Sequence, residues 1–146
     1  GLRRPDKLKV TVGHRDGFIG EGQISYAGLG AEARGQLALS VLKFRLADIK
    51  ALDSRFELIG VNAIHGSNLA EGCAPYEVRA RAAIRVATRV DAETVAHEVE
   101  ALYLNGPASG GGVTQSVREV IAAESVLRPS IQSQPTLLKI WTFLLL

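Results

Sequence analysis

Cysteine and methionine are nearly missing from this 146-residue sequence, which has one cysteine, Cys73, and no methionine. A single cysteine excludes an intrachain disulfide framework and a cysteine zinc cluster, so we expect a reducing, cytoplasmic environment. Nothing near Gly1 has the pattern of a secretory signal peptide. Because an initiator methionine is missing as well, we expect the chain to be part of a longer protein.

Excess charge and long apolar runs are missing too. The 17 basic and 15 acidic residues leave a net charge of +2, which gives no reason to expect nucleic acid or a membrane surface as a partner. The apolar content of 47% is enough for the core of one soluble domain. We place this domain at residues 1–129, followed by an atypical apolar tail at 130–146 that is too short to cross a bilayer.

The chain opens with two extended segments. Residues 7–14 alternate between apolar and polar side chains, which predicts a half-buried strand. The glycines and the aspartate within 13–17 predict a turn. A second strand is expected over 18–27, where Gly20 and Gly22 indicate a bulge or a close backbone approach.

The rest of the chain predicts an α+β fold. After the second strand the order is strand, helix, strand, strand, helix, strand, which is typical of the ferredoxin-like split βαβ (βαββαβ) arrangement, here with an extra N-terminal strand. Right-handed crossovers would place both helices on one face of the sheet. The predicted elements are a helix over 31–49, strands over 56–64 and 75–87, a helix capped by Asp91 and ended by 105–107, and a strand over 113–127.

The opposite face of this sheet is expected to carry a row of arginines. Arg79, Arg81, Arg85 and Arg89 follow the polar side of the alternation in the strand over 75–87. They would either grip an acidic substrate, such as a coenzyme A phosphate, or form ion pairs across strands. We favour pairing, with Glu119 and Glu124 as the partners.

Three further patterns have a functional and a structural interpretation. Residues 28–33 fit a loose dinucleotide-binding pattern, but the next strand runs into a hairpin, so a turn that caps a helix is favoured. His14, Asp16, Glu21 and His65 could transfer protons or bind a divalent metal, yet their spacing matches no known ligand motif and we predict no metal site. The segment 105–112, which includes three consecutive glycines, would cradle an anion or simply join two elements. His97 is expected in solvent, and Cys73 is not expected to act as a nucleophile.

Four stretches resemble one family. They are residues 7–28, 58–66, 75–79 and 98–112, and together they are similar to the later part of the main domain of the acyclic terpene utilisation (AtuA-type) proteins, with the likeness running from about 8 to 127. The resemblance implies a role in the bacterial breakdown of citronellol- and geraniol-type acids through coenzyme A thioesters. It also implies a main domain that extends upstream. Leu29, His14 and the tail after Pro129 depart from the family pattern.

Two functions are therefore expected. The first is a part in acyclic terpene or branched acyl-CoA catabolism, in which the segment lines the site of an acyl substrate; the reaction and any cofactor are left open. The second is a non-catalytic assembly domain whose open sheet face binds the upstream domain or another subunit, with homo-oligomers among the options. For the first function we expect catalytic roles for Asp16, Glu21 and His65, and substrate-binding roles for Gly20, Gly22, Asn105, Gly110, Gly111 and Gly112.

Overall fold

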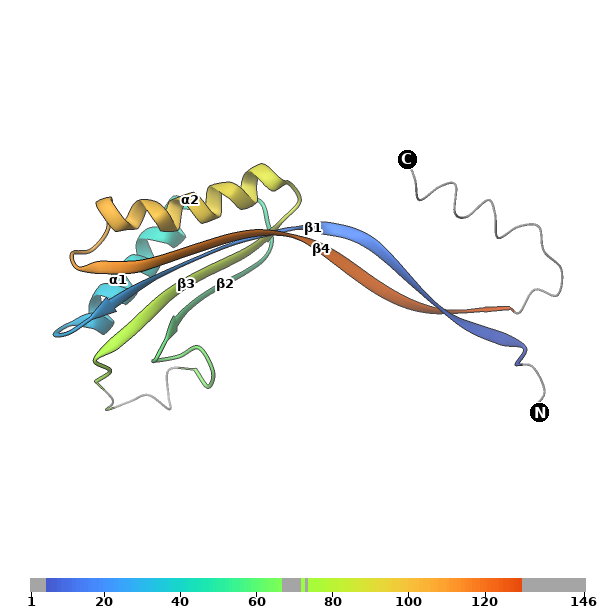
Figure 1. Cartoon of the computed structure of the whole chain (residues 1–146), viewed down its shortest axis with the longest axis horizontal. Coiled ribbons are helices and arrows are strands. Elements are labelled where there is room, and N and C mark those ends of the chain that lie inside the picture. The colour runs from blue at the N-terminus through green and yellow to red at the C-terminus, as the bar shows by residue number, and fades with distance from the viewer. Residues whose placement is uncertain (1–4, 67–71, 73, 130–146) are drawn as a thin grey trace. The chain divides into compact units, whose positions relative to one another are not determined.

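In the computed structural model, residues 5–66, 72 and 74–129 are described, and they form an α+β structure with an antiparallel sheet. Within these residues the sheet has four strands in the order β2-β3-β1-β4 (Figure 1). This arrangement is compatible with the predicted split βαβ fold. The elements are β1 (Lys7–Ala27), α1 (Ala31–Arg45), β2 (Ala51–Ile59), β3 (Glu77–Val86), α2 (Arg89–Asn105) and β4 (Gly110–Pro129).

The prediction of an extra N-terminal strand was wrong. β1 is one strand of 21 residues that passes through the segment predicted as a turn. Gly17 has φ of 85° there, which indicates a local irregularity of the kind that a bulge produces inside a strand. Glycines within an extended segment were therefore mistaken for the end of a strand.

The chain divides into two units. Among the described residues, 5–14 and 122–129 form the first unit and 15–121 the second. In the first unit, the Thr11 and Ser125 hydroxyl oxygens lie 3.2 Å apart. The apolar side chains of the predicted alternation, Leu8, Val10 and Val12, are 38–45% exposed there, more than the half-buried strand we expected. The predicted tail at 130–146 lies outside the described residues.

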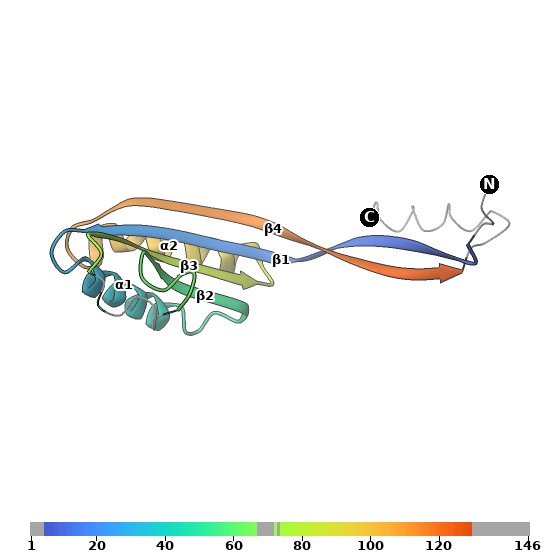
Figure 2. The ribbon, with the colours of Figure 1, turned by 90° about the horizontal axis from the view of Figure 1, so that it is seen from below.

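The core lies in the second unit, between the sheet and the two helices. Both helices contact β3, and α1 also contacts β2, so they cover the same face of the sheet, as predicted (Figure 2). Burying these side chains removes apolar surface from water and is the main source of stability. The largest fully buried side chains are Ile24, Tyr26, Leu42, Leu58, Val78, Val86, Val95 and Val99.

Several element ends differ from the prediction for local reasons. β2 occupies 51–59 rather than 56–64, because Gly60 ends it with a φ of 97° that other residues rarely adopt. α1 ends at Arg45, where Leu46 donates its N–H to the carbonyl of Leu42. α2 begins one turn earlier than predicted because Thr88 is the N-cap, its hydroxyl accepting from the N–H of Asp91. β4 begins at Gly110, so the predicted glycine loop is the start of a strand.

Candidate functional site

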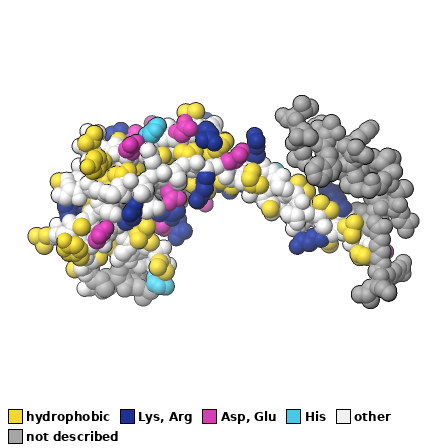
Figure 3. All heavy atoms as spheres, in the orientation of Figure 1, with side chains coloured by type: hydrophobic (Ala, Val, Ile, Leu, Met, Phe, Trp, Pro, Cys, Tyr) yellow, Lys and Arg dark blue, Asp and Glu magenta, His cyan; other side chains and the backbone are white. Residues whose placement is uncertain are grey.

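The open face of the sheet, opposite the helices, is the candidate functional site. Along β1 and β3 every second residue points into the core, and the residues between them point to this face. Glu21 and Gln23 come from β1, and Arg79, Arg81 and Arg85 from β3. The predicted arginine row is confirmed for these three, whereas Arg89 is the first residue of α2 and lies over the Phe18 ring instead. Basic and acidic side chains are interspersed across this side of the molecule (Figure 3).

Arg81 joins three strands on this face. Its Nη1 donates to Oε1 of Glu57 on β2 at 2.6 Å, and its Nε donates to Oε1 of Glu21 on β1 at 2.8 Å. Glu57 is 8% exposed, so its carboxylate is shielded from solvent. Arg55 also contacts Glu57, at 2.5 Å, and Gln23 donates to Glu21 at 2.9 Å. Both glutamates are therefore held by hydrogen bonds from charged or amide donors, which are the contacts that a shielded carboxylate requires.

The network determines the ionisation of Glu21. The hydrogen bond from Arg81 holds the pKa of the Glu21 carboxyl below its usual range, although partial burial opposes this, and Gln23 and Arg118 add to the lowering. The same contact raises the pKa of the Arg81 guanidinium. Both groups are thus fully charged near neutral pH. A permanently ionised glutamate with filled hydrogen bonds is an electrostatic anchor and a weak general acid.

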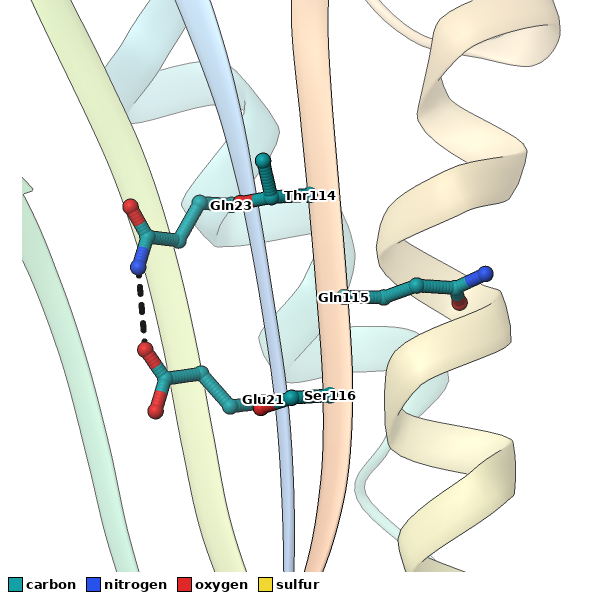
Figure 4. Close-up of a pocket in the computed structure, with 5 residues that line it drawn as sticks. All are labelled: Glu21, Gln23, Thr114, Gln115 and Ser116. Atoms are coloured by element: carbon teal, nitrogen blue, oxygen red, sulfur yellow. Dashed lines mark hydrogen bonds between the residues drawn. The ribbon is translucent and has the colours of Figure 1, made fainter.

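A shallow open hollow lies beside this network. Its volume is about 120 Å³, and it is lined by Glu21 and Gln23 of β1 and by Thr114, Gln115 and Ser116 of β4. Glu21 and Gln23 point to one side and are joined by their hydrogen bond, while Gln115 points toward α2 (Figure 4). Gln115 in fact donates to Glu100 of that helix at 3.3 Å. The hollow has room for a small polar group, since drug-sized ligands occupy roughly 300 Å³ or more.

The other two arginines of the row have different surroundings. Arg85 forms an ion pair with Asp16 at 3.2 Å. Arg79 donates from Nη2 to the carbonyl of Gly112 at 2.9 Å and to the Thr114 hydroxyl at 3.1 Å. The Nε atoms of Arg79 and Arg85 are both buried without an acceptor among the described residues.

The prediction that the arginine row forms ion pairs across strands was right, but the predicted partners were wrong. Glu119 forms its ion pair with Arg15 at 3.1 Å. Within the row, Arg81 pairs with Glu21 and Glu57, and Arg85 pairs with Asp16. Strand order is the reason. β3 lies between β1 and β2, so its side chains meet those strands before they meet β4.

The three predicted catalytic residues stand apart. Asp16 precedes Phe18, which pairs with Val86 at one end of the sheet. His65 is exposed in the turn after Ile59, which pairs with Arg79 toward the other end. Glu21 lies between these ends and faces the hollow. Their roles in catalysis stay predictions. The turn predicted over 13–17, next to Asp16, does not form because β1 is continuous.

Three of the predicted substrate-binding glycines, Gly20, Gly22 and Gly110, lie where the packing leaves no space for a side chain. A Cβ atom at Gly20 would lie 2.1 Å from the Ala92 carbonyl oxygen, and one at Gly22 would lie 2.5 Å from Cβ of Val99. A Cβ atom at Gly110 would lie 2.9 Å from Ile24. These glycines let α2 and the core approach the strands closely. Asn105 is the exposed last residue of α2, and Gly111 and Gly112 follow Gly110 in β4.

The dinucleotide-like segment forms the turn into α1. Gly28 and Gly30 have φ of 81° and 73°, and Gly30 is the N-cap of the helix. Arg34 donates to the carbonyls of Ala27, Leu29, Gly30 and Ala108 and so closes this turn against the segment before β4. The sheet beside it is antiparallel, unlike the parallel sheet of dinucleotide-binding folds. The turn interpretation is therefore the one that fits.

Sequence reasoning missed Gln23, Glu57, Thr114 and Ser116, which share the open face with Glu21. The signal was the same alternation that located the arginines, but it was not extended to β2 and β4. Cys73 lies outside the described residues. In the described part of the chain no group of three or more His, Cys, Asp or Glu side chains could hold a metal ion, and no helix is long and apolar enough to cross a membrane.

Comparisons with known proteins give one match. The sequence model of the acyclic terpene utilisation family protein AtuA matches residues 1–137. The match reaches eight residues past Pro129, so the expectation that the whole tail departs from the family was wrong for that part. No curated protein and no solved structure matches. Since the family model covers most of the 146 residues, the chain belongs to the acyclic terpene utilisation family AtuA.

Proposed function

We propose that this chain serves acyclic terpene utilisation as an assembly domain with a ferredoxin-like split βαβ fold, whose open sheet face docks onto another protein surface. One observation carries the proposal. The open face holds an ordered network of arginines and carboxylates that joins β1, β2 and β3, with Arg81 paired to both Glu21 and Glu57. No described element covers this face, because both helices lie on the other one.

A docking surface explains these features better than solvent does. The charged side chains of this face are already held by their ion pairs, so binding another protein would order few of them further. Arginine is also enriched in protein interfaces, where its planar group forms several hydrogen bonds at once.

A direct role in branched acyl-CoA catabolism is the second candidate. It is favoured by the polar hollow beside Glu21, which has room for a small polar group of a substrate. Against it, Asp16 and His65 lie toward opposite ends of the sheet. Glu21 is in addition held ionised by Arg81, which makes it a weak general acid.

The assembly proposal is tested by obstructing the open face with one large side chain. Ala83 lies on this face of β3, between Glu21 of β1 and Arg55 of β2 in register. In cells that express the protein and grow on an acyclic terpene, Ala83→Trp should reduce both growth and the native size of the protein on gel filtration. Ala33→Trp is the matched control, since Ala33 is exposed on α1. It should leave both readouts unchanged.

Folding is checked by circular dichroism of each purified chain, because an obstructed surface must not be confused with an unfolded one. An unchanged native size of folded Ala83→Trp would overturn the assembly proposal. The second candidate has its own test, in which Asp16→Asn, Glu21→Gln and His65→Ala are assayed for growth. If these variants stop growth while native size is kept, the catalytic role is supported instead.

A further inference from the structure

The described residues of the first unit form a two-stranded ribbon. β1 and β4 run side by side there in both views (Figures 1 and 2). The pairing of β1 with β3 begins only at Phe18, so in the described part of the chain residues 7–14 have β4 alone as a neighbouring strand. A ribbon of two strands has no packed face of its own and is marginally stable in water. A surface that covers one of its faces would therefore stabilise it.

The contact between the Thr11 and Ser125 hydroxyls fixes the register of this ribbon. Two short side chains come within 3.2 Å of each other when their residues stand directly opposite on one face of the pair. Side chains alternate between the two faces along each strand. Val10 of β1 and Val126 of β4 therefore stand opposite each other on the other face, which we call the ribbon face.

The ribbon face is self-complementary. On β1 an apolar residue stands two positions before Val10 and another stands two positions after it. On β4 an acidic residue stands two positions before Val126 and a basic one two positions after it. The apolar side chains of β1 are 38–45% exposed, and both charged side chains of β4 are exposed. The residues of the ribbon face are Leu8, Val10, Val12, Glu124, Val126 and Arg128.

We propose that the ribbon face binds the same face of a second copy of the chain, about a twofold axis that passes at Val10 and Val126. The rotation reverses the direction of the strands, so each of these valines meets its own counterpart. Glu124 then meets Arg128 of the partner subunit, and the reverse pair forms as well. One contact thus combines an apolar strip with two ion pairs, which is the self-complementarity that a twofold interface requires. This surface is additional to the open face, and the inference does not depend on the function proposed above.

The other face of the ribbon lacks this complementarity. Lys7 and Lys9 alternate onto it together with Thr11, and β4 contributes Ser125 and the 66% exposed Leu127. Two copies of that face would bring lysines together without a carboxylate from the described residues of the ribbon, and like charges at an interface suppress association. The ribbon face carries one acidic and one basic side chain, so its charges balance. Charge therefore selects the ribbon face as the one that receives a second copy.

Charge reversal tests the ion pairs across the axis. The purified 146-residue chain should be mostly dimeric at about 100 µM in sedimentation equilibrium, because a small interface typically gives micromolar affinity. Glu124→Arg and Arg128→Glu each place like charges opposite one another and should raise the dissociation constant at least tenfold. Lys9→Glu is the matched control, with the same change of charge as Arg128→Glu on the other face of the ribbon. It should change the dissociation constant by less than about twofold.

Two combinations of these substitutions restore complementarity. In the double variant, Glu124→Arg with Arg128→Glu, opposite charges again meet across the axis. In an equimolar mixture of the two single variants, one copy is basic at both positions and the other is acidic at both, so they complement each other. Both samples should return to within about threefold of the wild-type dissociation constant. Rescue by mixing also shows that the single variants are folded, and if neither sample associates, the twofold contact is wrong.

The remaining outcomes point to other occupants or another surface. A wild-type chain that is monomeric at the same concentration would overturn the proposal and leave the apolar segment 130–146, or a different protein, to cover the ribbon face. Equal weakening by Lys9→Glu and Arg128→Glu would overturn the choice of face. If Ala83→Trp removes the dimer and the charge reversals do not, the open face binds the second copy, and the ribbon inference alone fails. If the ribbon dimer forms but Ala83→Trp leaves native size in cells unchanged, the proposed function alone fails.

Discussion

The two faces of the same sheet differ in almost every physical property. On the helix side, Ile24, Val78 and Ile84 are at most 2% exposed, and Gly20 and Gly22 bring α2 against the strand. On the open side, the residues between them are Glu21, Gln23 and arginines joined by ion pairs. One strand thus contributes apolar packing to one surface and fixed charge to the other. The difference shows that apolar packing stabilises one side of the sheet, while no described element covers the other.

The largest expected effect comes from two neighbouring residues of β2 that point to opposite faces. Leu58 is fully buried against the helices, whereas Ile59 is 37% exposed. Leu58→Ala should lower the free energy of unfolding by about 2–5 kcal/mol, because it leaves a cavity in the core. Ile59→Ala should cost about 1 kcal/mol or less, since only partly buried surface is lost. Urea unfolding of both variants measures the difference, and equal losses would contradict the division into a packed and an open face.

The close approach of α2 to β1 can be tested by enlarging the side chain at Gly22 and shortening the one at Val99, which lies against it. Gly22→Ala adds a methyl group where the Val99 side chain lies and should cost about 1–3 kcal/mol of unfolding free energy. Val99→Ala alone should cost about 2 kcal/mol through a cavity. The double variant should lose less than the sum, because the new methyl group fills part of that cavity. Strictly additive losses in urea unfolding would show that the two sites do not compete for space.

Arg81→Met tests how much the charged face contributes to the fold. It leaves Glu21 and Glu57 shielded without their shared cation, so we expect a loss of about 1–2 kcal/mol at neutral pH. Arg55→Met is the control, since its side chain is 65% exposed and pairs with the same Glu57. Its loss should stay below about 0.5 kcal/mol.

The pH dependence of the same variant has a defined sign. The Glu21 pKa is lowered in the folded chain, so its contribution to stability is present above the unfolded pKa and is lost as pH falls through the folded one. In Arg81→Met, protonation of Glu21 instead relieves a partly buried carboxylate that has lost its main cation. The stability gap between wild type and variant should therefore narrow as pH falls from about 5 to 3, followed by urea unfolding at each pH. A gap that stays constant would show that Arg81 acts through packing alone.

Strand alternation predicted the general architecture well, since it depends only on which face of a strand is covered. The segment 75–87 was located from its period of two, and β3 occupies 77–86 with the expected face buried. The same period placed Arg79, Arg81 and Arg85 on the open side. What alternation cannot show is strand order. The partners of these arginines were predicted on β4, but β1 and β2 are the neighbours of β3.

Glycine was the least informative residue in the sequence. At Gly17 it lies inside a strand, at Gly60 it ends one, and at Gly22 it makes room for Val99. The sequence shows the same residue type in all three places, and only the tertiary neighbours of each glycine distinguish its role. This is why the predictions of a turn at 13–17 and of a loop at 110–112 were wrong. The hollow escaped prediction for a similar reason, because Glu21 and Thr114 meet only after distant strands pair.

The smallest expected effect comes from an ion pair on the helix layer, which completes the contrast with Arg81. Arg45 of α1 donates from Nε and Nη2 to the Glu98 carboxylate of α2, and its side chain is 49% exposed. Solvent screens such a pair, so Glu98→Gln should lower the melting temperature by less than about 2 °C, and 1 M sodium chloride should remove most of that difference. Arg81→Met should lower the melting temperature more than Glu98→Gln does, both at low salt and in 1 M sodium chloride, because the partners of Arg81 are shielded from solvent. Suppose that Glu98→Gln lowers the melting temperature as much as Arg81→Met does. Solvent exposure would then not explain the strength of these ion pairs, and the proposal that the charged face is a preformed docking surface would lose its support.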